Sequence, residues 1–290
     1  TQPMPSLFSW HFHHLPRWAH RVETGANHVV QLVLPFGLFL PQPVAGVAAT
    51  AIIVTQGWLV ISGNFAWLNA ITIVLATSAL PDAWLDRLPA LETAPGLAAP
   101  ETWLVVLAGV AFLATAWESR KPVRNMLSPA QAMNASFNPF HLVGTYGAFG
   151  SVTKTRYEVV LEGTDDPRPD PDSDWREYHF RAKPTDVRRR PPQFAPYHLR
   201  LDWLMWFLAM SPSPGRHGRW FSGLVGALLA ADPAVLGLLR DDPFGGDAPT
   251  AVRARRYRYR YTTRAERRET GAWWDRELVG EFLPPVGRRP

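Results

Sequence analysis

The chain has 290 residues, a net charge of +5 at pH 7 and no cysteine. The absence of cysteine excludes disulfide bonds and thiolate chemistry. Residues 1–136 carry six basic and six acidic side chains, so the whole net charge belongs to residues 137–290. The chain is therefore expected to consist of a nearly uncharged region, 1–136, and a basic region, 137–290.

The first region has the composition of membrane-embedded helices. From Thr24 to Pro81 it contains no Asp, Glu, Lys or Arg. A soluble helix needs a polar face, so such a stretch favours a lipid environment. The apolar runs predict helices near residues 17–40, 44–62, 65–80 and 102–117, with breaks at prolines or at Gly63-Asn64. We expect a polytopic helical bundle, whose first helix has an apolar part that is short for a full span.

Polar side chains in this region are candidates for lining a cavity between the helices. His20, Glu23 and Asn27 follow helical spacing, and polar groups at membrane depth usually face the protein interior. Asn64 and Asn69 lie at a break between two predicted helices, where either a plain hairpin or a lined site is possible. The cavity candidates are His20, Glu23, Asn27, His28, Asn64 and Asn69. Only His11 and His14 among the first histidines share a helical spacing, and both precede the helix, so no metal site is predicted.

A connector from Asn138 to Thr164 joins the two regions. It begins with a proline and three glycines and continues as an alternating strand pattern from Arg156 to Glu162. We expect this connector to pack a folded domain onto the helices, with Tyr146 and Phe149 at the seam.

The second region predicts a mixed α+β, β-sandwich-like domain over residues 137–290. Strands are expected at 156–162 and 175–182, joined by an acidic, proline-rich turn. Helices are expected at 199–210 and at 220–239, where Asp232-Pro233 interrupts the pattern. A strand at 256–262 places Tyr on one face and Arg on the other, and 264–282 reads as an amphipathic helix stopped by Leu-Pro-Pro.

Two features of the second region invite a functional interpretation. Arg253 to Arg268 interleaves Arg with Tyr, which fits a solvated strand face or a surface for anionic lipid; nucleic-acid binding is not predicted. Asp202 lies in an apolar helix and is predicted to form a structural ion pair with Arg200 or with one of Arg188 to Arg190. A catalytic acid is the alternative, but no second carboxylate stands at a fixed spacing. No phosphate loop, nucleophile elbow or zinc motif occurs, so no catalytic residue and no cofactor is assigned.

Several long blocks resemble one family, the lipase maturation factors. The clearest are SWHFHHLPRWAHRVETGANHVVQLVLPF, ISGNFAWLNAITIV, FNPFHLVGTYGAFGSVTKTRYEVVLEGT, WREYHFRAKPTDVRRRPPQFAPYHLRLDWLMWF and RYRYRYTTRAERRETGAWWDRELVGEFLPP. Together they extend from Ser9 to Pro285. The Gly- and Pro-rich composition without cysteine is more like a bacterial member, and membrane helices of the family are expected to precede residue 1.

The resemblance implies a membrane protein that helps secreted lipases reach an assembled state by a chaperone-like contact. In animal members the large domain faces the lumen of the endoplasmic reticulum, and in a bacterium it would be extracytoplasmic. The basic residues of the short loops instead favour a cytoplasmic position for this domain. Long domains, however, cross the membrane largely regardless of their charge, so the orientation implied by the resemblance is preferred. The expected partners are membrane lipids, a lipase-type client, and the preceding helices or another subunit.

Three hypotheses follow for the function. The first is a folding factor whose client surface lies on the second region; candidates for this surface are Phe149, Tyr157, Arg188, Arg189, Arg190, Tyr197, Trp203 and Trp206. The second is a membrane enzyme of the vitamin-K-dependent carboxylase-like class, with the polar helix residues around a lipidic or peptide substrate. The third is a structural subunit of a membrane complex.

Overall fold

A computed structural model describes residues 3–65, 67–87, 99–145 and 153–287. The chain forms two compact units: residues 1–84 together with 154–290, and residues 85–153. The connector residues Tyr146 and Phe149 lie outside the described ranges, so their expected place at a seam stays a prediction. The predicted domain boundary between residues 136 and 137 also stays a prediction.

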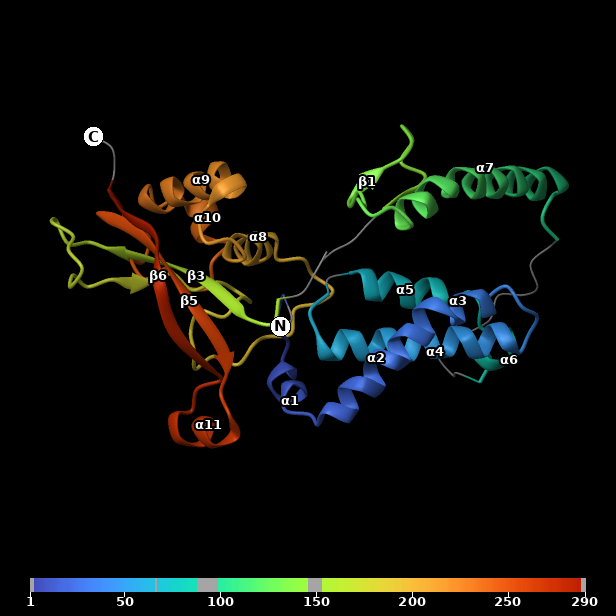
Figure 1. The fold of residues 1–290 in the computed structure, drawn as a ribbon, viewed down its shortest axis with the longest axis horizontal. Coiled ribbons are helices and arrows are strands. Elements are labelled where there is room, and N and C mark those ends of the chain that lie inside the picture. The colour runs from blue at the N-terminus through green and yellow to red at the C-terminus, as the bar shows by residue number, and fades with distance from the viewer. Residues whose placement is uncertain (1–2, 66, 88–98, 146–152, 288–290) are drawn as a thin grey trace. The chain divides into compact units, whose positions relative to one another are not determined.

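Helices make up the first part of the larger unit (Figure 1). They are α1 (Ser9–His13), α2 (Arg17–Leu32), α3 (Leu34–Gly37), α4 (Val44–Ser62), α5 (Leu68–Thr77) and α6 (Asp82–Leu85). The predicted helix 17–40 is divided near Pro35, because proline has no amide hydrogen to continue the ladder. The predicted helix at 65–80 is shorter, since α5 has only ten residues.

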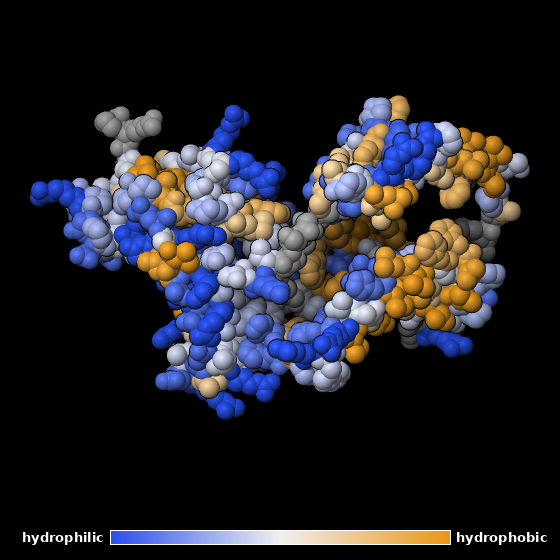
Figure 2. All heavy atoms as spheres, in the orientation of Figure 1, coloured by the Kyte–Doolittle hydropathy of each residue, from blue (hydrophilic) through white to orange (hydrophobic). Residues whose placement is uncertain are grey.

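Among the residues that the structure describes, two helices are long and apolar enough to cross a membrane, α4 and α7 (Thr102–Met126). Helix α4 buries its small residues Ala45, Ala48 and Ala49. Small side chains let neighbouring helices approach closely, as is common in membrane proteins. Figure 2 shows apolar residues gathered over the first helices and over α7, whereas hydrophilic residues prevail over the sheet region.

The smaller unit consists of α7 and a short antiparallel pair, β1 (Ala135–Ser136) and β2 (Gly144–Thr145). Helix α7 extends beyond the predicted residues 102–117 and buries none of its residues. The Lys121 ammonium near its end donates to the carbonyl of Phe137 at 3.3 Å, which ties the helix to the segment that follows.

The second part of the larger unit is a four-stranded antiparallel sheet in the order β4-β3-β5-β6. Its strands are β3 (Arg156–Thr164), β4 (Arg176–Glu177), β5 (Ala251–Tyr261) and β6 (Trp274–Gly287). Three helices, α8 (Arg200–Ala209), α9 (Gly218–Leu229) and α10 (Pro233–Leu236), lie over one face (Figure 1). The described residues thus form a mixed α+β domain, as predicted, but helices cover this face of the sheet, so the β-sandwich-like arrangement is wrong for them.

The two faces of the sheet bury different kinds of side chain. Val159 and Leu161 of β3 join the apolar core with α8 and α9. The alternate residues Glu158, Val160 and Glu162 point to the other face, where they meet the Tyr side chains of β5. On β5, Tyr257 and Tyr259 are buried and Arg258 and Arg260 are exposed, as the alternation predicts.

The predicted helix 264–282 is wrong. Helix α11 (Arg264–Thr270) begins at a capping box between Thr263 and Glu266 and ends at Gly271, which has a φ of 70°. A left-handed residue at this position stops a helix, and the chain then turns back as β6 along β5. The predicted strand 175–182 is also shorter, since regular pairing stops at Glu177 and only an isolated bridge follows at His179.

Candidate functional site

The segment before α2 lies between the end of α4 and the charged face of the sheet. Its carbonyl at Pro3 accepts a hydrogen bond from Arg156 Nη2 at 3.0 Å, and the carbonyl of Leu7 accepts one from Arg190 Nε at 3.0 Å. Trp10 Nε1 donates to the carbonyl of Thr262 at 2.9 Å. This short segment therefore connects the first helices to the sheet domain through its backbone carbonyls and the Trp10 side chain.

Asn64 completes the connection just after α4 ends. Its side-chain amide donates to the carbonyls of Pro5 and Pro192 at 2.8 and 2.9 Å. Its Oδ1 accepts from the backbone amides of Phe194 and Ala195 at 3.0 and 3.1 Å. Asn64 is 1% exposed, so these four bonds satisfy the buried amide group completely.

A buried charge cluster lies behind the same face of the sheet. Glu158 pairs with Arg156 at 2.6 Å and with Lys183 at 3.1 Å, and all three side chains are almost fully buried. Lys183 Nζ also donates to the carbonyl of Val159 at 3.0 Å. Two cations thus share the carboxylate of Glu158 in a region of low dielectric.

A pocket of about 370 Å³ lies where these elements meet, and we call it the junction pocket. Its lining comes from α1 and α2, from the end of α4, and from β3, β5 and β6 of the sheet. The residues are Ser9, Phe12, His13, His20, Glu23, Ser62, Lys154, Arg156, Tyr259, Arg260, Tyr261 and Trp274. Tyr261 and Trp274 stack with ring centroids 3.9 Å apart and give the pocket an aromatic side.

Hydrogen-bond donors outnumber acceptors among the charged groups of the junction pocket. Its one carboxylate, Glu23, already accepts from Trp58 Nε1 at 2.9 Å and lies 3.8 Å from His20 Nδ1. Burial lowers the pKa of His13, and the neighbouring histidines act in the same direction, so this imidazole is neutral at pH 7. Lys154 is exposed at the rim and makes no ion pair with any residue in the described ranges.

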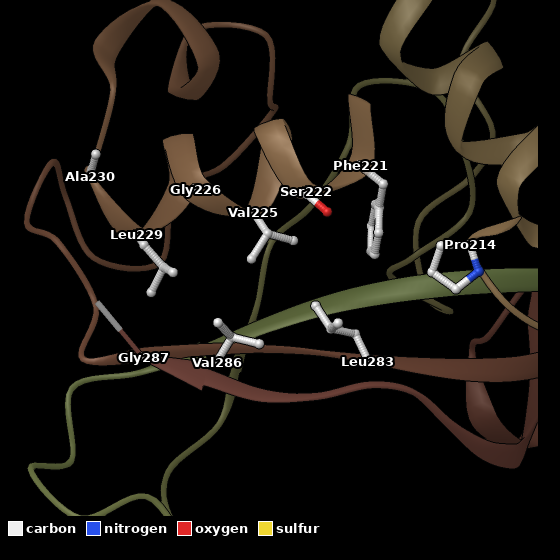
Figure 3. Close-up of a pocket in the computed structure, with 10 residues that line it drawn as sticks. All are labelled: Pro214, Phe221, Ser222, Val225, Gly226, Leu229, Ala230, Leu283, Val286 and Gly287. Carbon is white, nitrogen blue, oxygen red and sulfur yellow. The ribbon is translucent and has the colours of Figure 1, made fainter. Parts of the chain in front are cut away.

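A second cavity, of about 780 Å³, has a different chemistry. It lies between α9 and the end of β6, and most of the side chains that line it are apolar (Figure 3). Phe221, Val225 and Leu229 of α9 face Leu283 and Val286 of β6 across it. Among the described residues that line it, Ser222 alone has a polar side chain, so these residues offer mainly apolar contact.

The structure brings only part of the predicted cavity set together. His20 and Glu23 line the junction pocket. Asn27 bonds instead to Gln31 on its own helix, and His28 is exposed. Asn64 has its four backbone bonds, and Asn69 donates to Gln56 Oε1 at 2.6 Å, so neither amide lines this pocket.

The predicted client surface is also divided. Tyr197 is 76% exposed, and Arg188 is exposed as well. Tyr157 is partly buried beneath the Arg256 guanidinium, and Trp203 is partly buried beside His198.

Three other members of that predicted surface are buried or engaged in contacts within the domain. Trp206 is a core residue at 3% exposure, so its placement on a surface was wrong. Arg189 donates to the carbonyl of Phe180, and Arg190 lies over the ring of Trp273 besides its bond to Leu7. Phe149 lies outside the described residues.

The predicted ion pair of Asp202 with Arg200 is wrong. Asp202 Oδ1 accepts from the backbone amides of Ala182 and Lys183 at 2.7 and 2.9 Å. Within the described ranges no cationic side chain lies within ion-pair distance of this carboxylate, and burial raises its pKa. Asp202 therefore links α8 to the segment after β4 through hydrogen bonds. These contacts indicate a structural role for this carboxylate.

Lys154, Arg156 and Trp274 line the pocket although the sequence did not single them out, and Tyr261 was noted only as part of the stretch Arg253 to Arg268. They come from segments more than 130 residues after His20, and tertiary contacts bring them together. In β3 the acidic residues Glu158 and Glu162 alternate with apolar ones. This pattern could have indicated cationic partners nearby, because a charge on a buried strand needs a partner.

These observations define a class of protein. The chain joins a helical region with two segments able to cross a membrane to a sheet domain, through a polar junction of buried hydrogen bonds. Residues 1–87 match the family model of the lipase maturation factor transmembrane domain, and residues 142–284 match that of the lipase maturation factor C-terminal domain. The chain belongs to the lipase maturation factor family, and it is a membrane protein.

Animal relatives extend along the whole chain. Lipase maturation factor 1 of Bos taurus is 42% identical over 310 residues, which is 100% of this chain and 55% of the relative. The Homo sapiens protein of that name is 40% identical, over 99% of this chain and 54% of its own length. Lipase maturation factor 2 of Mus musculus is 28% identical, over 99% and 55%. The chain thus spans about half the length of these relatives, and no solved structure matches it.

Proposed function

We propose that this chain is the part of a membrane-embedded maturation factor that assists the folding or assembly of a lipase-type client. The match of both regions to the two lipase maturation factor domains carries the proposal. The names of the relatives state lipase maturation as their role, and the similarity covers both regions of this chain.

The proposed arrangement is a polytopic bundle that includes α4 and α7 and holds the sheet domain at the membrane surface. The domain is extracytoplasmic in this proposal, where a secreted client would meet it. Exposed Tyr197 is a contact candidate, since aromatic side chains are enriched in protein interfaces and little of this ring is buried in the domain.

A secretion assay tests the function. The protein is produced together with a secreted lipase in cells that lack their own maturation factor, and lipase activity is measured per mass of secreted lipase. We expect a rise over cells without the protein, and a smaller rise with Tyr197→Ser. Arg219→Ser, which alters an exposed side chain of α9, is the matched control. Equal specific activity with and without the protein would contradict the proposed function.

A further inference from the structure

The cavity between α9 and the end of β6 has the size and the walls of a site for an apolar ligand. Its volume of about 780 Å³ is within the range of small-molecule sites, and apolar side chains of the helix face apolar side chains of the strand across it (Figure 3). Walls of this kind bind a ligand by removing its apolar surface, and their own, from water. We call this cavity the α9–β6 groove.

A glycine leaves room on the helix side of the groove. Gly226 lines the groove, with open space where a side chain would begin. Gly223, three residues earlier, has the same open surroundings but is not among the described residues that line the groove. Glycine costs about 1 kcal/mol relative to alanine inside a helix, and here no protein atom packs into the space that it leaves.

The strand side of the groove disfavours an added peptide strand as the occupant. Among the described strands β6 is the last in the order of its sheet, so its outer edge is unpaired. Pro284 and Pro285 lie between the lining residues Leu283 and Val286, and proline has no amide hydrogen to donate to a further strand. An alkyl chain needs no hydrogen bonds from the backbone, so it fits this edge.

The charges of α9 favour a ligand with an anionic end. From Trp203 to Ala231 the chain contains no Asp or Glu but has the cations Arg216 and Arg219. Arg219 is exposed and makes no ion pair with any residue that the structure describes. It lies three residues before Ser222, hence on the same side of the helix, and the Ser222 hydroxyl points into the groove (Figure 3).

The acidic residues of the neighbouring elements lie away from this end of the groove or are neutralised. Asp232 follows the opposite end of α9, where its side chain caps α10. Glu281 of β6 pairs across the sheet with Arg255, on the face that α9 does not cover. Glu277 forms an ion pair with Arg258. The positive charge of Arg219 is therefore available to a ligand.

We propose that the α9–β6 groove binds a long-chain fatty acid. The alkyl chain lies between the helix and the strand over Gly226, and the carboxylate lies at the end where Ser222 and Arg219 stand. One groove with a cationic end matches a single chain with one anionic group. This site is independent of the client contact proposed at Tyr197.

Photolabelling of the full chain tests the proposal. The protein in uncharged detergent micelles is illuminated with palmitic acid that carries a diazirine in its chain, and the labelled peptides are identified by mass spectrometry. We expect saturable labelling of α9 and of residues 283–287. Unlabelled palmitic acid should compete at least about tenfold more effectively than methyl palmitate, which has no charge for Arg219.

Three outcomes of this experiment would overturn the proposal. Equal competition by methyl palmitate would show that the carboxylate is not recognised. Labelling confined to other segments would place the fatty acid elsewhere. Stronger competition by an extended apolar peptide than by palmitic acid would assign the groove to a protein partner.

Two glycines of α9 supply a matched pair of variants. Gly226→Leu fills the groove and should reduce saturable labelling about tenfold or more, because the ligand would have to displace the new side chain. Gly223→Leu adds the same side chain outside the lining and should stay within about twofold of wild type. Thermal melting of both variants shows that the fold is kept, and equal labelling of the two would contradict the site.

A charge variant tests the carboxylate end. Arg219→Glu should weaken labelling by the palmitic acid probe about tenfold and leave labelling by the methyl ester of the same probe unchanged. Arg268→Glu makes the same change at an exposed position of α11 and should stay within about twofold of wild type for both probes. Equal effects of Arg219→Glu on the acid and on the ester would overturn the role given to Arg219 and with it the choice of a fatty acid.

Discussion

Single polar residues, more than apolar ones, hold the junction together. The amide of Asn64 satisfies two carbonyls and two backbone amides that come from two separate segments, one at Pro5 and one at residues 192–195. A buried group with all its partners present specifies one arrangement, because any other leaves polar atoms unpaired.

Replacing Asn64 with Asp should therefore be severely destabilising. The new carboxylate faces the carbonyl oxygens of Pro5 and Pro192 in place of two donors, and the cost should be about 3 kcal/mol or more. The apparent melting temperature in detergent measures the effect. Asn27→Asp makes the same change at an exposed pair on α2 and should melt within a few degrees of wild type. Equal melting of the two variants would contradict the role given to Asn64.

The buried cluster of two cations and one carboxylate predicts an asymmetric response to mutation. Glu158→Gln removes the carboxylate with which both Arg156 and Lys183 pair and should cost about 3–5 kcal/mol. Lys183→Met removes one of these two buried cations together with its desolvation cost and keeps the pair of Arg156 with Glu158, so it should cost clearly less. Chemical unfolding followed by tryptophan fluorescence compares them, and a larger loss for Lys183→Met would contradict the central role given to Glu158.

Glu177 gives the sheet domain a defined dependence on acid. Burial acts to raise the pKa of Glu177, but the nearby His179 imidazole and two hydrogen bonds from Arg276 outweigh it and hold this pKa at about 2. Because the folded-state pKa is below the ordinary value of 4.5, the carboxylate stabilises the fold above pH 4.5. That contribution, about 3 kcal/mol, is lost as the pH falls from 4.5 to about 2.

The variant Glu177→Gln isolates this effect. The difference in unfolding free energy between wild type and variant should be largest at neutral pH and shrink toward zero by pH 2. Urea unfolding at a series of pH values measures it, with the exposed Glu281→Gln as the matched control. A difference that stays constant over this range would mean that the pKa of Glu177 is not depressed.

At the scale of elements, the turn between α11 and β6 depends on one glycine. Gly271 adopts a φ of 70° with open space around its Cα, so a side chain there meets backbone strain and no clash. Gly271→Ala should cost about 1 kcal/mol. Gly280→Ala in β6, also in open space but without a positive φ, should be neutral. Thermal melting of both variants checks this, and equal melting would contradict the strain.

How far the sequence predicts an element depends on whether its signal is local. The residues of α4 could be read from an uncharged run between Pro43 and Gly63, because both ends are marked by breakers. The predicted helix 264–282 was wrong because an apolar period cannot distinguish a helix from a twisted edge strand with bulges. The capping box at Thr263 and Glu266 followed by Gly271 was the local signal for the shorter helix.

At the scale of the whole molecule, the site could be predicted only in part. His20 and Glu23 share a helical stripe, which a single segment reveals. The partners of Asn64 and Asp202 are backbone groups, which are present at every residue and so leave no mark in the sequence. The predicted partner of Asp202, Arg200, is therefore wrong. Lys154 and Arg156 reach the pocket because β3 pairs with the distant strand β5. A single segment of sequence does not reveal which distant strands pair.

The proposed membrane arrangement makes a prediction that the cysteine-free chain is suited to test. Single cysteines are introduced at Ser173, in the loop before β4, and at Val110, inside α7. In intact cells a membrane-impermeant maleimide should label Ser173→Cys, because the domain is proposed to be extracytoplasmic, and should not label Val110→Cys. Labelling of Ser173→Cys only after the cells are opened would contradict the proposed orientation.

The bond between Trp10 and Thr262 joins residues 252 positions apart, and this has a consequence for biosynthesis. At ribosomal rates α4 is complete roughly 10–40 s before β5 and β6 are made, whereas an isolated helix forms within microseconds. The first helices must therefore wait, already in the membrane, with their junction residues unpaired. A chain that stops before β5 keeps its membrane helices but has no surface on which to close the pocket. Quality control of this protein is thus expected to act on the open junction of nascent chains.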